Sequence, residues 1–534
     1  MDARTRLPAI GGRARRVVLA YAAFSVVEYA IWVAVILYAY GVGGTALAGL
    51  VGVVQLLPAA FLSPTIASLG DRLPRGTALV GGYLAMCLVT AAVAIALLLD
   101  APTWAIVTLS AVATTLVSAV RPVHFAAVPA LARSSGELVA ANSYSSAGEG
   151  VAAFLGPVLA GVVAQVAGPS AVFIGASLLS AVAAASVLAL GLPRGEESDT
   201  HPLRAALAGL AHLRGDWPAL SLLLVMAVGF VLTGAVDVLG VTYAVGVLGE
   251  GEASAGLIIG AAGIGGVLGA LSAAWFVNRP RLVPVLLVGG LLQGAGVAAV
   301  AAVGSLPGAM LVLTVAGASG AIVLVGGRTL IQRATDDRVL ARVFAVQEST
   351  ALLGLALGTA IAPLLVEAVG GRAAFVPLGL GALGVVALGV ILARRLDDRA
   401  VYPAEAIALL RSTAMLALAP QPALERMARE GVWREVATDE VVVRQGDRGD
   451  EFFVVASGSL GVEVDGVRRP HRISVGEGFG EIALLLDVPR TATVLALEPT
   501  RVLAVGSAAF LAAVTGDEDL RRRADATARG TVAD

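Results

Sequence analysis

Long apolar stretches fill the first 395 residues of the chain, and short alternating segments fill the rest. An apolar helix of about 20 residues crosses a hydrocarbon layer ~30 Å thick, so stretches of that length predict twelve transmembrane helices between Val17 and Leu392. The predicted spans are 17–40, 46–69, 77–99, 103–127, 139–167, 170–192, 217–247, 253–277, 282–303, 308–330, 342–369 and 373–392. This region is therefore expected to be an all-α membrane protein.

The two sets of six predicted helices repeat one another at an offset of about 206 residues. Gly156-Pro157 in the fifth helix, for example, superimposes on Ala362-Pro363 in the eleventh. A 6+6 pseudo-repeat with a long middle loop follows. The expected domains are an N-terminal half at 1–192, a cytosolic middle loop at 193–216, a C-terminal half at 217–395, a linker at 396–403 and a separate domain at 404–534.

The pattern changes after Pro403 to short alternating strands separated by Gly-Asp and Asp-Gly turns, such as Asp465-Gly466. Such strands and turns predict a small antiparallel β-roll or jelly roll. Helical segments flank it, at Ala404 to Arg411, at Pro422 to Glu430 and from Ser507 onward. The C-terminal domain is therefore expected to be a cytosolic α+β domain.

Composition supports a membrane protein and excludes several other classes. The 534 residues are 57% hydrophobic and 14% charged, with a mean hydropathy of +0.87, which is too apolar for a soluble protein. A net charge of −2 argues against a nucleic-acid partner. Cys87 is the only cysteine and the four histidines lack metal-ligand spacing, so we expect no disulfide, metal or cofactor. Without a nucleophile motif or a Walker-type loop, we also expect no enzyme activity.

Arginines, which are the only basic residues here, fall on alternate predicted loops. The positive-inside rule then places both termini and the C-terminal domain in the cytosol. The absence of lysine and the abundance of alanine, glycine and valine are typical of a GC-rich bacterial genome, so the expected location is a bacterial inner membrane, with lipid as a partner.

A phosphate-binding pattern lies in the C-terminal domain. Phe479 to Leu484 read F-G-E-I-A-L, and Pro489 to Ala492 read P-R-T-A. A bound phosphate needs backbone N–H groups at a helix start and a fixed cation opposite them. Gly480 to Ala483 and Arg490 can supply both, and Glu481 adds an acceptor for a ribose hydroxyl.

These residues resemble the phosphate-binding cassette of the cyclic nucleotide-binding domain, and the resemblance covers roughly 404 to 515. It implies that Arg490 binds the cyclic phosphate, Glu481 the ribose 2′-OH, and the N–H groups of Ile482 and Ala483 the phosphate oxygens. Thr491 carries a hydroxyl that can reach a guanine amino group, which makes cGMP tolerable without excluding cAMP. The alternatives are an ordinary surface ion pair between Glu481 and Arg490, or a domain that has kept its fold and lost its ligand.

Two patterns in the membrane region resemble the major facilitator superfamily. The loop after the second predicted helix keeps three charged residues of that family's loop motif, and the resemblance implies a charge latch at the cytosolic gate; these residues are Asp71, Arg72 and Arg75. In the fifth helix, Gly156, Pro157 and Gly161 resemble the signature of the family's antiporters, although alanine replaces two of its glycines. Topology-setting loop charges and generic tight helix packing are the alternative explanations.

Ionisable residues inside a membrane cost about 2.5–3.5 kcal/mol on insertion scales, so each is a candidate functional residue. Glu28 lies midway along the first helix and Asp237 midway along the seventh. Either can carry a coupled proton or pair with a cationic substrate, or make a structural hydrogen bond to a neighbouring helix. Gate contacts are expected for four further residues, which are Arg121, Glu149, Arg328 and Glu348.

The sequence therefore favours a secondary transporter, a proton-coupled exporter of an unknown small molecule, gated by cytosolic cyclic nucleotide and foremost by cAMP. Binding is expected to reorder the segment from Asp517 to Arg529. A non-transporting receptor or anchor for the nucleotide sensor remains open. So does an exporter of the cyclic nucleotide itself.

Overall fold

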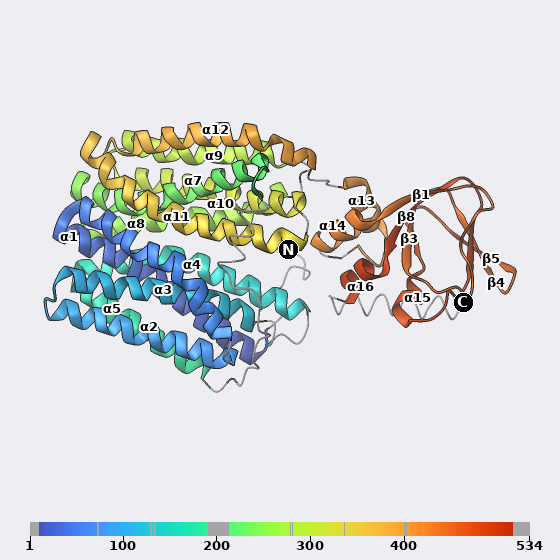
Figure 1. The fold of residues 1–534 in the computed structure, drawn as a ribbon, viewed down its shortest axis with the longest axis horizontal. Helices are drawn as coiled ribbons and strands as arrows, with labels where there is room; N and C mark the ends of the chain where they lie inside the picture. The colour runs from blue at the N-terminus through green and yellow to red at the C-terminus, as the bar shows by residue number, and fades with distance from the viewer. Residues whose placement is uncertain are drawn as a thin grey trace. The chain divides into compact units, whose positions relative to one another are not determined.

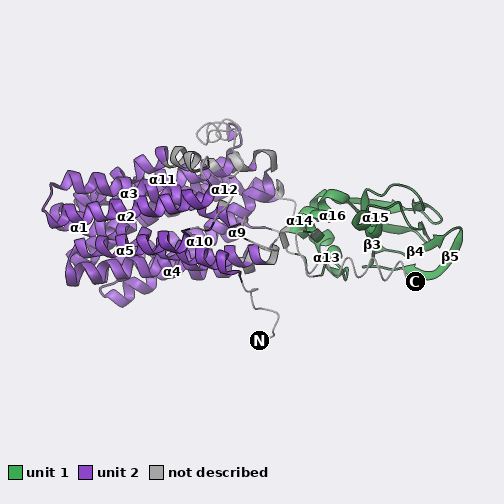
Figure 2. Ribbon diagram, turned by 90° about the horizontal axis from the view of Figure 1, so that it is seen from below, with its two compact units in different colours: residues 1, 133–136, 401–534 green, residues 2–132, 137–400 purple. Residues whose placement is uncertain are grey.

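The computed structural model describes residues 10–71, 74–128, 131, 135–188, 190, 213–277, 279, 281–335, 337–399, 403–417, 419 and 421–515. The chain divides into two compact units (Figure 2). The larger unit consists of residues 2–132 and 137–400 and is a helical bundle. The smaller unit contains residues 401–534, together with Met1 and 133–136, and carries the strands.

The helices of the larger unit lie side by side along the length of the bundle (Figure 1). They are α1 (Gly12–Asp71), α2 (Arg75–Leu98), α3 (Thr103–Ala127), α4 (Ser135–Ala167), α5 (Pro169–Val187), α7 (Trp217–Val241) with its π-helical continuation η2 (Thr242–Val247), α8 (Glu252–Val277), α9 (Val283–Ala299) with the short 3₁₀ turn η3 (Val300–Ala302), α10 (Leu306–Ala334), α11 (Asp337–Val369) and α12 (Phe375–Arg399). Within the described residues, 11 helices are long and apolar enough to cross a membrane.

Helix α1 accounts for the first two predicted spans, because its 60 residues are interrupted by a sharp turn. Gly43 and Gly44 leave the helical region, and Gly44 has a φ of +63°, which glycine adopts at no steric cost. The chain therefore crosses the bundle twice within α1. The predicted architecture of twelve crossings is confirmed on this basis.

The two halves, α1–α5 and α7–α12, meet along pairs of helices that contain small residues at the contact. A Cβ on Gly161 of α4 would lie 2.5 Å from the Glu252 carbonyl oxygen of α8. On the other side of the bundle, a Cβ on Gly49 of α1 would lie 2.6 Å from the Thr359 carbonyl oxygen of α11. Glycine therefore allows the backbones of the two halves to approach closely at both seams.

Helix α12 continues to Arg399, seven residues beyond the predicted end of its span at 392. Asp397 lies in this extension and accepts hydrogen bonds from the N–H groups of Leu282 and Val283 at 2.9 and 3.0 Å. Those N–H groups belong to the start of α9, where they lack intrahelical partners. The extension is therefore tied to the neighbouring helix.

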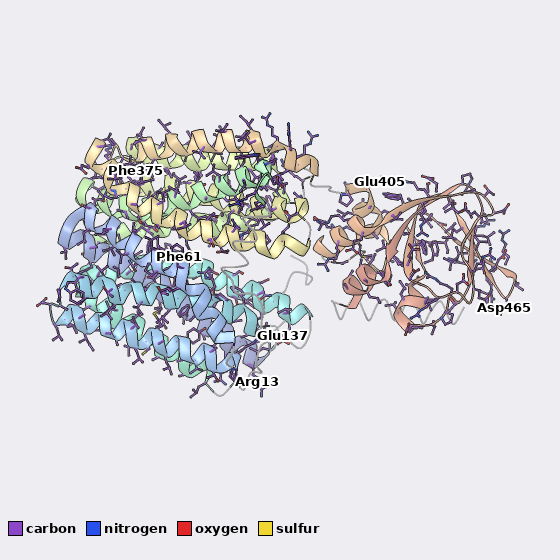
Figure 3. The ribbon with its side chains drawn as sticks, in the orientation of Figure 1. Arg13, Phe61, Glu137, Phe375, Glu405 and Asp465 are labelled. Carbon is purple, nitrogen blue, oxygen red and sulfur yellow. The ribbon has the colours of Figure 1, made fainter. Side chains whose placement is uncertain are left out.

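The smaller unit confirms the predicted β-roll with flanking helices. Its strands are β1 (Val432–Val436), β2 (Val441–Val443), β3 (Glu451–Ser457), β4 (Leu460–Val464), β5 (Val467–Ile473), β6 (Gly478–Phe479), β7 (Thr493–Ala496) and β8 (Thr500–Gly506). They form two antiparallel four-stranded sheets, ordered β1-β8-β3-β6 and β2-β7-β4-β5. Asp465 sits at the β4–β5 turn, as Figure 3 shows, where it and Gly466 both have positive φ.

Alternating side chains of β3 hold this unit together. Phe453 faces the second sheet and packs with residues such as Val494. Phe452 faces the opposite way and stacks on Phe510 with 4.4 Å between the ring centroids. The helices on that side are α13 (Ala404–Ser412), α14 (Gln421–Glu430) and α16 (Ser507–Thr515), while the segment from Asp517 to Arg529 lies outside the described residues.

Candidate functional sites

The cassette residues come together where β6 leads into the short helix α15 (Glu481–Leu486). Gly480 joins the two with a φ of +90°, and a Cβ there would lie 2.5 Å from the Arg490 Nη1 atom. A second glycine, Gly449, borders the guanidinium from the loop before β3, where a Cβ would lie 2.5 Å from Arg490 Nε. A side chain at either position would therefore displace the Arg490 guanidinium from its place.

Arg490 is buried, with only 7% of its surface exposed, and contacts hold it from several directions. Its Nη1 donates to the Gly480 carbonyl at 2.9 Å and its Nη2 to the Glu451 carbonyl at 2.7 Å. The guanidinium also lies 5.8 Å from the centroid of the Phe453 ring, within range of a cation–π interaction. These contacts fix the direction of the positive charge. Sequence reasoning missed Glu451 and Phe453 because a backbone carbonyl and a core aromatic leave no sequence signal.

Glu481 is also 7% exposed, and its Oε2 atom has no hydrogen-bond partner among the described residues. Burial raises the pKa of its carboxyl above the ordinary value of 4.5, against the opposing effects of a backbone hydrogen bond and of Arg490. Burial likewise lowers the pKa of Arg490. Both side chains are buried and Arg490 donates to carbonyls, so this is not a surface ion pair. An orphaned buried acceptor beside a fixed cation fits a ligand with a hydroxyl and a phosphate.

The remaining cassette residues line the same turn. The side chains of Ile482 and Ala483 are buried. Their N–H groups belong to the first turn of α15, where N–H groups lack intrahelical partners. Thr491 follows Arg490 and is exposed. The structure thus brings the predicted nucleotide-binding residues together, from Gly480 through Ala483 and at Arg490 and Thr491.

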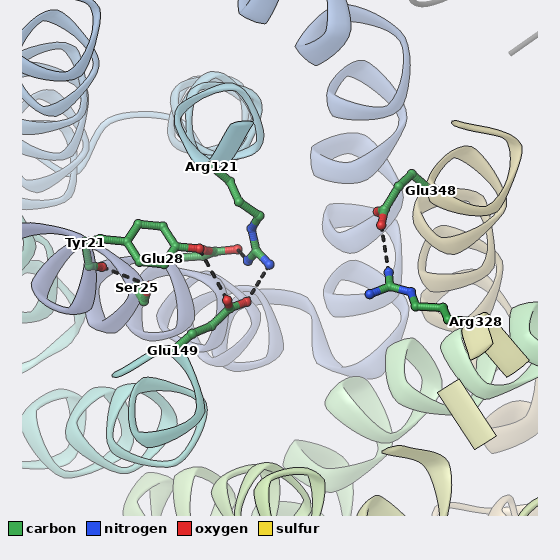
Figure 4. A network of polar contacts seen from close by, with 7 residues as sticks. All are labelled: Tyr21, Ser25, Glu28, Arg121, Glu149, Arg328 and Glu348. Carbon is green, nitrogen blue, oxygen red and sulfur yellow. Dashed lines mark hydrogen bonds and ion pairs between the residues drawn. The ribbon is translucent and has the colours of Figure 1, made fainter. Parts of the chain in front are cut away.

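The larger unit holds a charged network between three helices of the N-terminal half (Figure 4). Arg121 of α3 donates from Nη2 to Glu28 of α1 at 2.9 Å and from Nη1 to Glu149 of α4 at 2.5 Å. The Oε2 atom of Glu28 is buried and has no partner in the described part of the chain. Glu28 and the expected gate pair Arg121 and Glu149 therefore form one network, which the sequence treated as separate.

A second polar layer joins the same three helices. Tyr21 of α1 donates to Glu149 at 3.3 Å and stacks on His124 of α3, with ring centroids 3.9 Å apart. His124 is fully buried and its Nε2 lies 3.0 Å from the Ser145 hydroxyl of α4. These residues lie one or two helical turns from Arg121, Glu149 and Glu28, so helical spacing was the signal available in the sequence.

Asp237 lies at the junction between the two halves. Its Oδ2 accepts a hydrogen bond of 2.9 Å from the Trp32 indole of α1. Further along, the hydroxyls of Thr45 and Thr242 lie 2.9 Å apart and also join α1 to the C-terminal half. Asp237 is 9% exposed, so its hydrogen bond belongs to a buried contact between the halves.

The other predicted gate residues include one ion pair of the C-terminal half and the loop after α1. Arg328 of α10 pairs with Glu348 of α11 at 2.8 Å within the C-terminal half. Arg75 is the first residue of α2, Asp71 ends α1 with its side chain outside the described part, and Arg72 lies outside the described residues.

The residues of the antiporter-like pattern lie at packing contacts of α4. A Cβ on Gly156 would lie 2.5 Å from the Tyr29 Cβ of α1, and Gly161 faces the start of α8. Pro157 sits inside α4 without ending the helix. Close packing accounts for the two glycines, so their role in transport stays a prediction.

Comparison with known families agrees with both units. The sequence model of the Major Facilitator Superfamily matches residues 17–312, more than half of the chain, so the chain belongs to this superfamily. The model of the cyclic nucleotide-binding domain matches residues 433–517. The protein is therefore a major facilitator fused to a C-terminal cyclic nucleotide-binding domain.

Curated relatives match less than a fifth of the chain. A cAMP-dependent protein kinase regulatory subunit of Debaryomyces hansenii is 38% identical over 87 residues, 16% of this chain and 19% of that protein. An uncharacterized protein of Mycobacterium tuberculosis is 40% identical over 95 residues, 18% of this chain and 19% of that protein. The chain thus spans about a fifth of the length of these relatives. The regulatory domain of Toxoplasma gondii protein kinase A with cAMP is 26% identical, with a TM-score of 0.20, over 21% of this chain and 44% of that one.

Proposed function

We propose that the protein is a proton-coupled exporter of a small molecule, regulated by cytosolic cyclic nucleotide, foremost cAMP, that binds to its C-terminal domain. It is a secondary transporter and not an enzyme. Its place is a bacterial inner membrane, with both termini and the nucleotide-binding domain in the cytosol. The arginine-rich loops of the sequence support this orientation.

The Arg121 network supports proton coupling. One cation holds two carboxylates between three membrane helices, and one oxygen of Glu28 has no partner among the described residues. A proton or a donor group of a cationic substrate can satisfy that oxygen, and the two would then compete. Because Arg121 is already bound to two carboxylates, the network does not favour a phosphate-bearing cargo such as cyclic nucleotide.

Glu481 and Arg490 lie together in one buried site, and this arrangement is the main support for regulation by cyclic nucleotide. The site offers an acceptor for the ribose hydroxyl and a fixed charge for the phosphate. The name of the Debaryomyces relative supports cAMP as the ligand, and the exposed hydroxyl of Thr491 leaves room for cGMP.

Proteoliposomes that contain a pH-sensitive dye test the transport part of the proposal. A panel of cationic and neutral small molecules is applied with and without cAMP on the side of the nucleotide-binding domain. We expect some compounds to evoke proton movement, and cAMP to change its rate. Glu28→Gln should abolish the proton movement, whereas Glu367→Gln, at an exposed position of α11, should preserve it.

Each outcome separates the candidate functions. Proton movement that survives Glu28→Gln would remove Glu28 from the coupling step. If the wild-type protein binds cAMP and no compound evokes proton movement, a non-transporting receptor or anchor becomes the better hypothesis.

A further inference from the structure

The seam between the two halves carries an apolar groove. It lies between α4 and α8 and has a volume of about 210 Å³. All of its lining surface is apolar. The walls are formed on α4 by Gly150, Val151, Phe154 and Leu155, and on α8 by Ile264, Val267 and Leu268. A Cβ on Gly150 would lie 2.7 Å from the Val267 side chain, so the helices are in close contact at its base.

The groove opens toward the surroundings of the bundle at membrane depth. Its residues lie inside the candidate membrane spans Ala140–Ala167 and Glu252–Ala273. Val151 is 53% exposed on one wall and Leu268 is 52% exposed on the other. Hydrocarbon is the solvent at this depth, and an unfilled apolar hollow loses dispersion contacts along its whole lining.

The two walls belong to different halves of the molecule. Any molecule that lies in the groove contacts α4 and α8 at once, so its binding depends on how the halves are arranged. A ligand that prefers one arrangement shifts the population toward it. We therefore propose that the α4–α8 groove binds one acyl chain of a membrane phospholipid, and that the bound chain stabilises the arrangement of the halves seen here. This inference holds whatever the transported substrate is.

Photolabelling of the full-length protein tests the site. Phosphatidylglycerol with a diazirine on one acyl chain is the probe, and labelled peptides are mapped by mass spectrometry. We expect labelling at 150–155 and 264–268 well above that on other exposed faces of the bundle. Leu268→Trp, which fills the groove, should lower this labelling at least fivefold. Leu271→Trp should leave it unchanged, because Leu271 is 70% exposed on the same helix but does not line the groove.

Even labelling of all exposed faces would mean annular lipid only and would overturn the proposal, as would unchanged labelling of a folded Leu268→Trp protein. If that variant does not fold, Val151→Phe fills the groove from the opposite wall and is judged by the same standard.

A disulfide tests the effect on the two halves. Thr45→Cys with Thr242→Cys, in a Cys87→Ser background, places thiols where the two hydroxyls lie 2.9 Å apart. Added phosphatidylglycerol should speed disulfide formation at least threefold in detergent, and Leu268→Trp should remove this dependence on lipid. A rate that lipid does not change would refute the stabilising effect of the chain.

Discussion

At the scale of single residues, Arg490 is expected to provide most of the charge recognition in the nucleotide-binding domain. Its side chain is buried and donates to two carbonyls, so Arg490→Ala leaves no other cation in its place. A hydrogen bond to a charged group contributes about 1.5–3 kcal/mol, so cAMP affinity should fall roughly 10- to 150-fold. Titration calorimetry on the full-length protein measures it, with Arg472→Ala on the exposed strand β5 as the control. Equal affinities of both variants would place the phosphate elsewhere.

Glu481 is expected to show a conflict between stability and binding. Burial raises its pKa, so the folded chain binds a proton more readily than the unfolded chain, and stability falls as the pH rises from about 4.5 through the raised pKa. Glu481→Gln removes this penalty. The apparent unfolding temperature should therefore rise near pH 7, by the equivalent of about 1–3 kcal/mol, and the difference from wild type should shrink below pH 4.5.

The same variant should bind cAMP more weakly, because the amide is a poorer acceptor for the ribose hydroxyl than a carboxylate. Scanning calorimetry at several pH values and a cAMP titration measure the two effects. A variant that is less stable than wild type at pH 7 would show that Glu481 already has a strong partner in the folded chain.

The sequence identified the cassette residues because they lie in two short segments close together in the chain, but it did not show which distant residues meet at each site. Glu28, Arg121 and Glu149 lie on three helices and meet only through packing. His124 was missed because a lone histidine without ligand spacing is uninformative by itself, although it lies one helical turn from Arg121. Its contact with Tyr21 depends on side chains 103 positions apart in the sequence.

At the scale of elements, the link between α12 and α9 offers a direct test. Asp397 accepts hydrogen bonds from two N–H groups at the start of α9, as a capping residue does within its own helix. Loss of such a cap costs about 0.5–2 kcal/mol. Asp397→Ala should therefore lower the apparent unfolding temperature of the full-length protein, whereas Arg395→Ala, exposed on the same helix, should not. Equal unfolding temperatures would show that water replaces the carboxylate.

The length of the apolar stretches predicted the helices well, because a hydrocarbon layer fixes the length and composition of the helices that cross it. It did not predict that α12 continues past 392, since the last two turns are charged, and Asp397 in these turns makes tertiary hydrogen bonds that an apolar count does not contain. It also missed η2, where the helix after Val241 widens into π-helical turns.

Regulation of the protein requires that nucleotide binding and the arrangement of the halves be energetically coupled. Thermodynamic linkage makes this coupling reciprocal, so it can be measured without knowing the substrate. If cAMP favours one arrangement of the halves, the two arrangements must differ in their affinity for cAMP by the same factor by which cAMP shifts the equilibrium between them. Couplings of about 1–3 kcal/mol are typical and correspond to roughly 5- to 150-fold.

The Thr45→Cys and Thr242→Cys pair supplies the lock, because it joins the halves through residues of the larger unit only. The cAMP dissociation constant of the full-length protein is measured before and after oxidation of the pair. We expect it to change at least fivefold in one direction, and cAMP to change the rate of disulfide formation in the matching direction. Oxidation of either single-cysteine variant is the control and should change nothing. A dissociation constant that oxidation leaves unchanged, together with a rate of disulfide formation that cAMP leaves unchanged, would mean that the nucleotide-binding domain does not sense the contact between α1 and α7–η2. Regulation through alternating access would then be wrong.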